Sequence, residues 1–151
     1  MSSWLGFQSK LVSIRPAALT TWNLILHLHT AYLTFFDNML SSTIPTEIGH
    51  LTNLLTLDFG SNKLFGTIPK EIGRMSALAG LSFFDNNLTG AIPVELENLD
   101  GLQVLYLDSN NLEGPVSDGI CDLSLSEFWS DCSEVECICC TKCCVDGGGC
   151  T

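Results

Sequence analysis

One sequence pattern is repeated end to end in this chain, and the repetition constrains the fold more than any other feature. Its copies begin at Leu54, Leu78 and Leu102 and read LLTLDFGSNKLFGTIP, LAGLSFFDNNLTGAIP and LQVLYLDSNNLEGPV. A weaker copy, TAYLTFFDNMLSSTIP, begins one period before the first, at Thr30. A fixed period in the twenties indicates a solenoid, in which each unit buries its apolar side against its neighbours.

Each copy places two apolar residues two positions apart, followed by an asparagine. Alternation in a strand sends such a pair to one face, so stacked copies predict a parallel sheet with one strand per copy. The apolar pairs are Leu33 and Phe35, Leu57 and Phe59, Leu81 and Phe83, Leu105 and Leu107.

The asparagines share one position in every copy: Asn38, Asn62, Asn86 and Asn110. Asparagine is a common turn residue. An amide that recurs at the same position of every repeat instead favours a ladder of hydrogen bonds, in which each side chain pairs with backbone groups of neighbouring repeats. We expect these four residues to be structural.

The pattern LxxLxLxxNxLxGxIP, together with IPTEIGHLTNL and IPKEIGRMSAL, resembles the plant-type leucine-rich repeat of receptor-like proteins and of diatom relatives. The resemblance implies an α/β-type solenoid with short parallel strands on a concave face, an irregular or 3-10 convex side and a cysteine-rich carboxy-terminal cap. We expect three parts: an unassigned segment at 1–29, four repeats at 30–120, and the cap with its tail at 121–151.

All eight cysteines lie in the last part: Cys121, Cys132, Cys137, Cys139, Cys140, Cys143, Cys144 and Cys150. An even number in a short terminal segment favours disulfides and an oxidising compartment. A zinc site is the alternative, because Cys140 and Cys143 form a CxxC step to which nearby thiolates could add. No second CxxC step lies at zinc-finger spacing, so disulfides are favoured over a metal site and over reduced thiols.

The last repeat of a solenoid needs a cover for its apolar face, which gives the cap a structural role. We expect this cover to come from the apolar residues that follow the repeats: Leu123, Leu125, Phe128 and Trp129.

Residues 1–29 do not continue the repeat, since Ile14 occupies the position of the ladder asparagine. Lys10 and Arg15 precede an uncharged run, as in a signal peptide or a membrane span. The run contains Trp22, histidines and threonines, which fit neither well. We therefore favour a truncated or misjoined amino terminus, and membrane association would require a missing segment.

The net charge is −11, and the segment from Met75 onward contains thirteen acidic residues but only one basic residue, Lys142. Nucleic acids and anionic membranes bind through clustered Lys and Arg, so both are poor partners. A basic partner and a merely solvated acidic surface both remain open.

The concave face usually binds the ligand in proteins of this kind, and its outward positions mix aromatic and acidic residues. Exposed aromatic residues suggest recognition of a protein or peptide, although each ring could simply shield its neighbour. Four strands give about 200 Å² of such surface, small beside the roughly 800 Å² per partner of an ordinary interface. The candidate ligand-binding residues are Tyr32, Thr34, Phe36, Asp37, Asp58, Ser82, Phe84, Asp85, Tyr106 and Asp108.

Other function classes have weaker support. His27, His29 and His50 stand in no catalytic motif, and we expect no catalytic residue, metal or cofactor. An ice-binding or cell-wall surface would need regular threonine columns, whereas the relevant column reads Thr43, Thr67, Ala91 and Pro115.

A glycosylation acceptor, Asn87-Leu88-Thr89, supports the secretory route. We therefore predict a non-enzymatic, extracellular or cell-surface recognition module. The alternatives are a surface-adhesion protein and an intracellular scaffold with a metal-binding cap.

Overall fold

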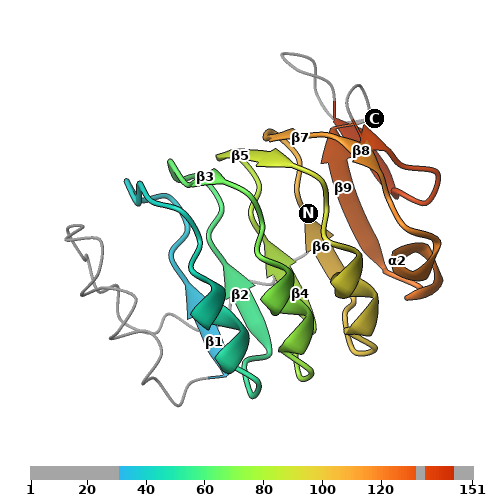
Figure 1. Cartoon of the computed structure of the whole chain (residues 1–151), viewed down its shortest axis with the longest axis horizontal. Helices are drawn as coiled ribbons and strands as arrows, with labels where there is room; N and C mark the ends of the chain where they lie inside the picture. The colour runs from blue at the N-terminus through green and yellow to red at the C-terminus, as the bar shows by residue number, and fades with distance from the viewer. Residues whose placement is uncertain (1–30, 132–134, 145–151) are drawn as a thin grey trace.

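The computed structural model describes residues 31–131 and 135–144, in which the chain winds as a solenoid of coils lying side by side (Figure 1). One side of the coils carries a parallel sheet of six strands in this part of the chain. In spatial order these are β1 (Tyr32–Thr34), β2 (Thr56–Asp58), β4 (Gly80–Ser82), β6 (Val104–Tyr106), β9 (Glu127–Asp131) and β11 (Lys142–Cys144). The predicted solenoid with short parallel strands is confirmed.

The opposite side of the coils carries short helices. These are the 3-10 helices η1 (Thr46–His50), η2 (Lys70–Arg74) and η3 (Val94–Asn98), followed by the α-helix α2 (Asp118–Asp122). Pro45, Pro69 and Pro93 each precede a 3-10 helix in extended conformation, where the missing N–H of proline costs little. None of the helices in the described residues is long and apolar enough to cross a membrane.

Shorter strands pair along a third edge of the coils. β3 (Phe65–Gly66), β5 (Asn87–Gly90) and β7 (Asn111–Leu112) form one group. β8 (Gly114–Pro115) pairs with β10 (Val135–Glu136). All of these pairs are parallel, as stacking of equivalent coil segments requires.

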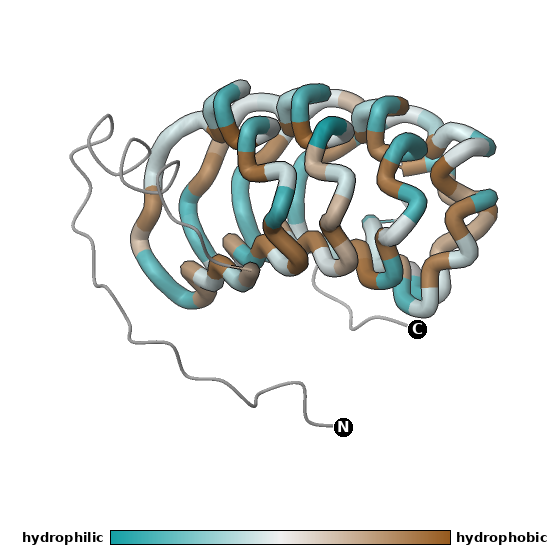
Figure 2. The backbone as a smooth tube through the Cα atoms, turned by 90° about the horizontal axis from the view of Figure 1, so that it is seen from below, coloured by the Kyte–Doolittle hydropathy of each residue, from teal (hydrophilic) through white to brown (hydrophobic). Residues whose placement is uncertain are grey.

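The core is a continuous column of apolar side chains inside the coils, and hydrophobic stretches recur from coil to coil (Figure 2). Leu33, Leu57, Leu81 and Leu105 stand in register across the sheet, and all are buried. The rings of Phe35, Phe59 and Phe83 stack with centroid separations of 5.3 and 6.1 Å. Each ring therefore packs on the equivalent ring of the next coil.

The asparagines form a hydrogen-bonded ladder between the coils. The Asn62 amide donates to the carbonyls of Phe35, Phe59 and Gly60 at 2.8–3.0 Å, and its oxygen accepts from the Leu40 N–H at 3.0 Å. Asn86 and Asn110 repeat these bonds one coil further on. Each of these side chains thus ties two coils together through otherwise unpaired backbone groups.

Close contact between coils on the helical side depends on glycine. A Cβ atom at Gly49 would collide with the backbone carbonyl of Glu71, and one at Gly73 would collide with that of Glu95. The sequence IPxEIG therefore encodes the spacing of the coils as well as the turn.

The cap continues the sheet through β9 and β11, so the sheet has six strands in the described residues where the repeats predicted four. Phe128 of β9 stands in register with Leu105 and is completely buried, as expected of a residue that covers the last repeat. Strand β11 then pairs with β9, and Thr141 accepts a hydrogen bond from the Phe128 N–H at 2.7 Å.

The cap strands do not keep the period of the repeats. Ser82 pairs with Tyr106 at the full repeat step, whereas Tyr106 pairs with Trp129, one position short of it. The next partner, Lys142, follows Trp129 at a much shorter step. The sequence columns of the repeats therefore do not extend into the cap.

Asp131 takes over where the ladder ends. In the preceding coil, the N–H groups of Asp85 and Asn86 donate to the backbone carbonyls of Asp108 and Ser109. One coil later, those of Ser109 and Asn110 donate instead to the two carboxylate oxygens of Asp131, at 2.8 and 2.9 Å. A buried carboxylate therefore replaces the carbonyls of a further coil.

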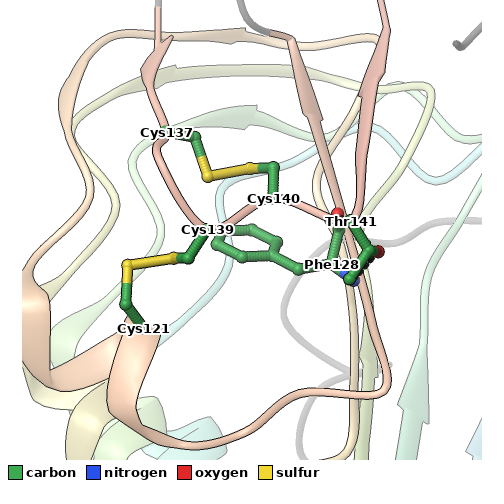
Figure 3. Close-up of a disulfide and its surroundings, with 6 residues drawn as sticks. All are labelled: Cys121, Phe128, Cys137, Cys139, Cys140 and Thr141. Carbon is green, nitrogen blue, oxygen red and sulfur yellow. Dashed lines mark hydrogen bonds between the residues drawn. A yellow bond between two sulfur atoms is a disulfide. The ribbon is translucent and has the colours of Figure 1, made fainter.

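Two disulfides are described in the cap, Cys121–Cys139 and Cys137–Cys140, and the ring of Phe128 lies beside them (Figure 3). The first joins α2 to the segment that leads into β11. These bonds occupy sulfur atoms that the zinc alternative would have required, and among the described residues no three metal-binding side chains are grouped. Four other candidates fall outside the side chains that the structure describes: Cys132, Cys143, Cys144 and Cys150. The expectations for residues 1–29 lie outside the described residues as well.

The ladder generates a stability prediction. Replacing Asn86 by alanine leaves the Leu64 N–H and three carbonyls without this partner. We expect a loss of about 1–3 kcal/mol in the free energy of unfolding, measured by urea denaturation. The neighbouring exposed Asn87 is the matched control, because Asn87→Ala should leave stability within about 0.5 kcal/mol. Equal stability of the two variants would contradict the structural role of the ladder.

Candidate functional site

The outward surface of the six-stranded sheet, together with the residues that directly follow its strands, is called the strand face below. Of the ten residues predicted to bind a ligand, five lie in the strands (Tyr32, Thr34, Asp58, Ser82 and Tyr106) and five follow the strand ends (Phe36, Asp37, Phe84, Asp85 and Asp108). Their exposure differs strongly. Ser82 and Asp108 are buried, whereas Asp58, Phe84 and Tyr106 are half-buried. The exposed members are Tyr32, Thr34, Phe36, Asp37 and Asp85.

An aromatic pair occupies the amino-terminal half of the strand face. The rings of Phe36 and Phe84 lie 5.8 Å apart, although one whole coil separates the two residues. They meet over Gly60, where a Cβ atom would collide with the Phe84 ring. Phe36 remains 45% exposed, so mutual shielding of the rings is incomplete and an apolar surface is left open.

A second cluster occupies the carboxy-terminal half, and the cap supplies most of it. The Tyr106 ring packs at 4.7 Å on Trp129, and its hydroxyl donates to the Glu127 carboxylate. The Lys142 ammonium lies 4.5 Å from the centre of the Trp129 ring, within the range of a cation–π contact.

Trp129 was expected to plug the core, and this expectation is wrong. Neighbouring residues in a strand point to opposite faces, so the burial of Phe128 sends Trp129 outward. Glu127 and Lys142 belong to this surface as well, although the repeat pattern did not predict them.

Two buried polar groups lie between these clusters without a hydrogen-bond partner. They are the Ser82 hydroxyl and the Oδ1 atom of Asp108, and their residues are 9% and 6% exposed. The nearby Asp58 differs, because its Oδ1 atom accepts from the Gly60 N–H at 2.9 Å. Buried polar groups are normally paired, so each of these is a place where a binding role is worth testing.

Burial also changes the acid–base properties of this region. It raises the pKa of Asp108, and the negative charges of Asp131 and Asp85 raise it further. The backbone N–H of Asp108 and the charge of Lys142 act in the opposite direction. Burial likewise raises the pKa of Tyr106, with added contributions from Glu127 and Asp108. Both groups are therefore held in surroundings that disfavour their anionic forms.

The strand face is acidic. Within the described residues, Asp37, Asp58, Asp85, Asp108 and Glu127 lie on or beside it, with Lys142 as their opposing charge. Other cations, Lys70 and Arg74, belong to η2 on the opposite side of the coils. The helices also carry Glu47, Glu71, Glu95, Glu97, Asp118 and Asp122, so both sides of the solenoid are acidic.

The raised pKa of Asp108 yields a prediction about stability and pH. Between its ordinary value of 3.8 and its raised value in the folded state, Asp108 keeps a proton that the unfolded chain has lost, so stability falls as the pH rises through this interval. Above both pKa values the carboxylate is charged and the full penalty remains. Asp108→Asn removes that penalty and should raise the melting temperature at neutral pH. The gain should shrink as the pH falls toward about 4, where the unfolded carboxyl also protonates. The exposed Asp100→Asn is the control, and a lower melting temperature for Asp108→Asn at neutral pH would contradict the prediction.

Comparison with known proteins agrees with the repeat fold. The model of the leucine-rich repeat matches residues 53–75 and 101–123. The GASSHO1/SCHENGEN3 receptor-kinase ectodomain from Arabidopsis thaliana, solved with CASPARIAN STRIP INTEGRITY FACTOR 2, is 36% identical over 66% of this chain and 12% of its own, with a TM-score of 0.62. The plant peptide hormone receptor RGFR1, solved with RGF2, is 32% identical over 68% of this chain and 16% of its own, with a TM-score of 0.62.

A third similar structure is a plant ice-binding protein, 32% identical over 60% of this chain and 30% of its own, with a TM-score of 0.57. The chain therefore spans less than a third of the length of each of these three proteins. Among curated proteins, none matches the sequence. The repeat signature, the parallel sheet and the structural similarity lead to one conclusion: the chain is a leucine-rich-repeat protein of the plant type.

Proposed function

We propose that this protein is a non-enzymatic recognition module that binds a peptide through its strand face. The observation that carries the proposal is the Phe36–Phe84 pair over Gly60, an aromatic surface that the fold leaves partly open. Aromatic anchors of this kind commonly dominate binding energy. The similar receptor ectodomains named above were solved in complex with RGF2 and with CASPARIAN STRIP INTEGRITY FACTOR 2, which supports a ligand of the peptide or protein class.

The size of the surface favours a short peptide over a folded protein. The sheet has six strands at a spacing of about 4.8 Å, and each strand presents a length of about four residues. The area of the strand face is therefore on the order of 300 Å². This exceeds the estimate for four strands, because β9 and β11 enlarge the sheet. It still falls short of the roughly 800 Å² per partner of a standard protein interface.

We place the protein outside the cell or at its surface. The support is the pair of disulfides in the cap, since such bonds persist in oxidising compartments. Asn87 of the glycosylation acceptor is exposed, so a glycan has room at this position. We also retain the division into repeats at 30–120 and a cap at 121–151 as a proposal, with the repeats forming the binding unit to which the cap adds residues.

Surface adhesion is the second candidate, because one similar structure is a plant ice-binding protein. Ice recognition by a flat array would need equivalent side chains in successive coils. Thr43 and Thr67 are exposed and equivalent, but Ala91 and Pro115 occupy the next two coils. A thermal hysteresis assay decides this alternative, and measurable hysteresis would favour adhesion over peptide recognition.

Two exposed phenylalanines allow a matched test of the strand face. Phe36 belongs to it, whereas Phe65 of β3 lies on another edge of the coils, and the two rings are 45% and 49% exposed. Peptides selected from a displayed random dodecapeptide library should lose about tenfold or more in affinity for Phe36→Ala. Their affinity for Phe65→Ala should stay within about twofold of the unmodified protein.

Isothermal titration calorimetry measures both affinities, and thermal melting confirms that the variants are folded. Peptides that depend on Phe65 and tolerate the loss of Phe36 would place binding elsewhere. A selection that enriches no peptide at all would contradict the proposed function.

A further inference from the structure

We propose that the ligand of the strand face carries an arginine or lysine side chain that seats beside Asp108 and Ser82, about three residues from an apolar anchor on the Phe36–Phe84 pair. This inference rests on the proposed function and specifies the chemistry of the same site. It follows from charge, from unpaired polar atoms and from the spacing of the coils.

Charge complementarity is the first support. Asp85 and the buried Asp131 lie within electrostatic reach of Asp108, and Asp108 and Glu127 lie within reach of Tyr106. Lys142 supplies one opposing charge, but its ammonium group is engaged over the Trp129 ring. A net negative potential therefore remains at this point of the strand face, and a cationic side chain lowers it.

The unpaired polar atoms are the second, independent support. The Ser82 hydroxyl and Asp108 Oδ1 lack hydrogen-bond partners in the described structure, and both residues are more than nine-tenths buried. A guanidinium or ammonium group carries several N–H donors and can satisfy both acceptors. Side-chain rotation on binding, which is common at interfaces, gives the ligand access to these atoms.

Aromatic rings on both sides favour a cation over a neutral donor. Phe84 leans toward Phe36 over Gly60, so its ring is displaced away from the coil that carries Asp108. Tyr106 stands on the other side and is held by Trp129 and by its hydrogen bond to Glu127. A guanidinium group that comes within about 6 Å of either ring centre gains cation–π energy in addition to its ion pair.

The coil spacing defines the ligand motif. Gly60, beneath the aromatic pair, and Asp108 are equivalent positions two coils apart, a separation of about 10 Å at about 4.8 Å per coil. An extended peptide that crosses the coils advances about 3.3 Å per residue. An apolar residue and a basic residue about three positions apart therefore reach both subsites together.

The test uses peptides selected from the random dodecapeptide library and resynthesised with citrulline in place of the basic residue. Citrulline keeps the shape of arginine but removes its charge. On the unmodified protein, this exchange should weaken binding by about tenfold or more. On Asp108→Asn, the parent peptide should already be weakened by a similar factor, and the exchange should add less than about twofold.

The matched control is Asp122→Asn, which removes the same charge from an exposed residue of α2 and should leave affinity unchanged. Circular dichroism melting shows that Asp108→Asn is folded. Peptides that depend on Phe36 but tolerate citrulline, or that bind Asp108→Asn normally, would overturn the cationic subsite while leaving the strand-face function intact.

A second measurement is independent of the selected peptides. N-acetylarginine amide is titrated into the protein while the carboxyl carbon resonance of Asp108 is followed by NMR, with N-acetylcitrulline amide as the control. A saturable shift with the arginine compound alone supports the subsite. Equal shifts with both compounds, or no shift with either, would contradict it.

Discussion

The pairing of backbone groups where each strand turns into the next segment is the constraint on which this solenoid depends. A coil that leaves the sheet exposes N–H and carbonyl groups that water cannot reach once the next coil stacks on it. Asn62, Asn86 and Asn110 each satisfy four such groups, and Asn62 does so through its contacts with Phe35, Phe59, Gly60 and Leu40. Within the described part of the chain, the side chain of Asn38 in the first coil bonds only to carbonyls of its own coil. The apolar columns supply the driving force for stacking, and the amide ladder fixes the register at which stacking occurs.

The same constraint explains how the solenoid ends. In each coil, two N–H groups donate to carbonyls of the next coil. The last complete coil has no such successor, so the N–H groups of Ser109 and Asn110 would be left unpaired. The Asp131 carboxylate accepts both of them, Phe128 covers the apolar column, and the Cys121–Cys139 disulfide holds α2 against the cap. A carboxylate suits this position because it offers two acceptors and donates nothing.

Sequence columns predicted the repeated part of the fold because each column has one physical role. Leucine, phenylalanine and asparagine recur at fixed phases, and their roles require no knowledge of distant contacts. The cap could not be predicted in this way because its strands do not follow the repeat period. Trp129 pairs with Tyr106, and Lys142 pairs with Trp129. Its ladder position is also filled by a different chemical group, the carboxylate of Asp131. Trp129 was consequently assigned to the core, one position away from the residue that enters it.

The strand face was predicted as a set of positions, but its chemistry depends on neighbours across the sheet. Phe36 and Phe84 form a pair because the intervening coil has Gly60 between them, and no single repeat contains that information. The burial of Ser82 and Asp108 likewise depends on side chains from adjacent coils. Stability alone would favour removing a desolvated carboxylate that sits close to Asp131 and Asp85. A group that weakens the fold and faces the binding surface is better explained by recognition than by packing, since stability and function often conflict at such sites.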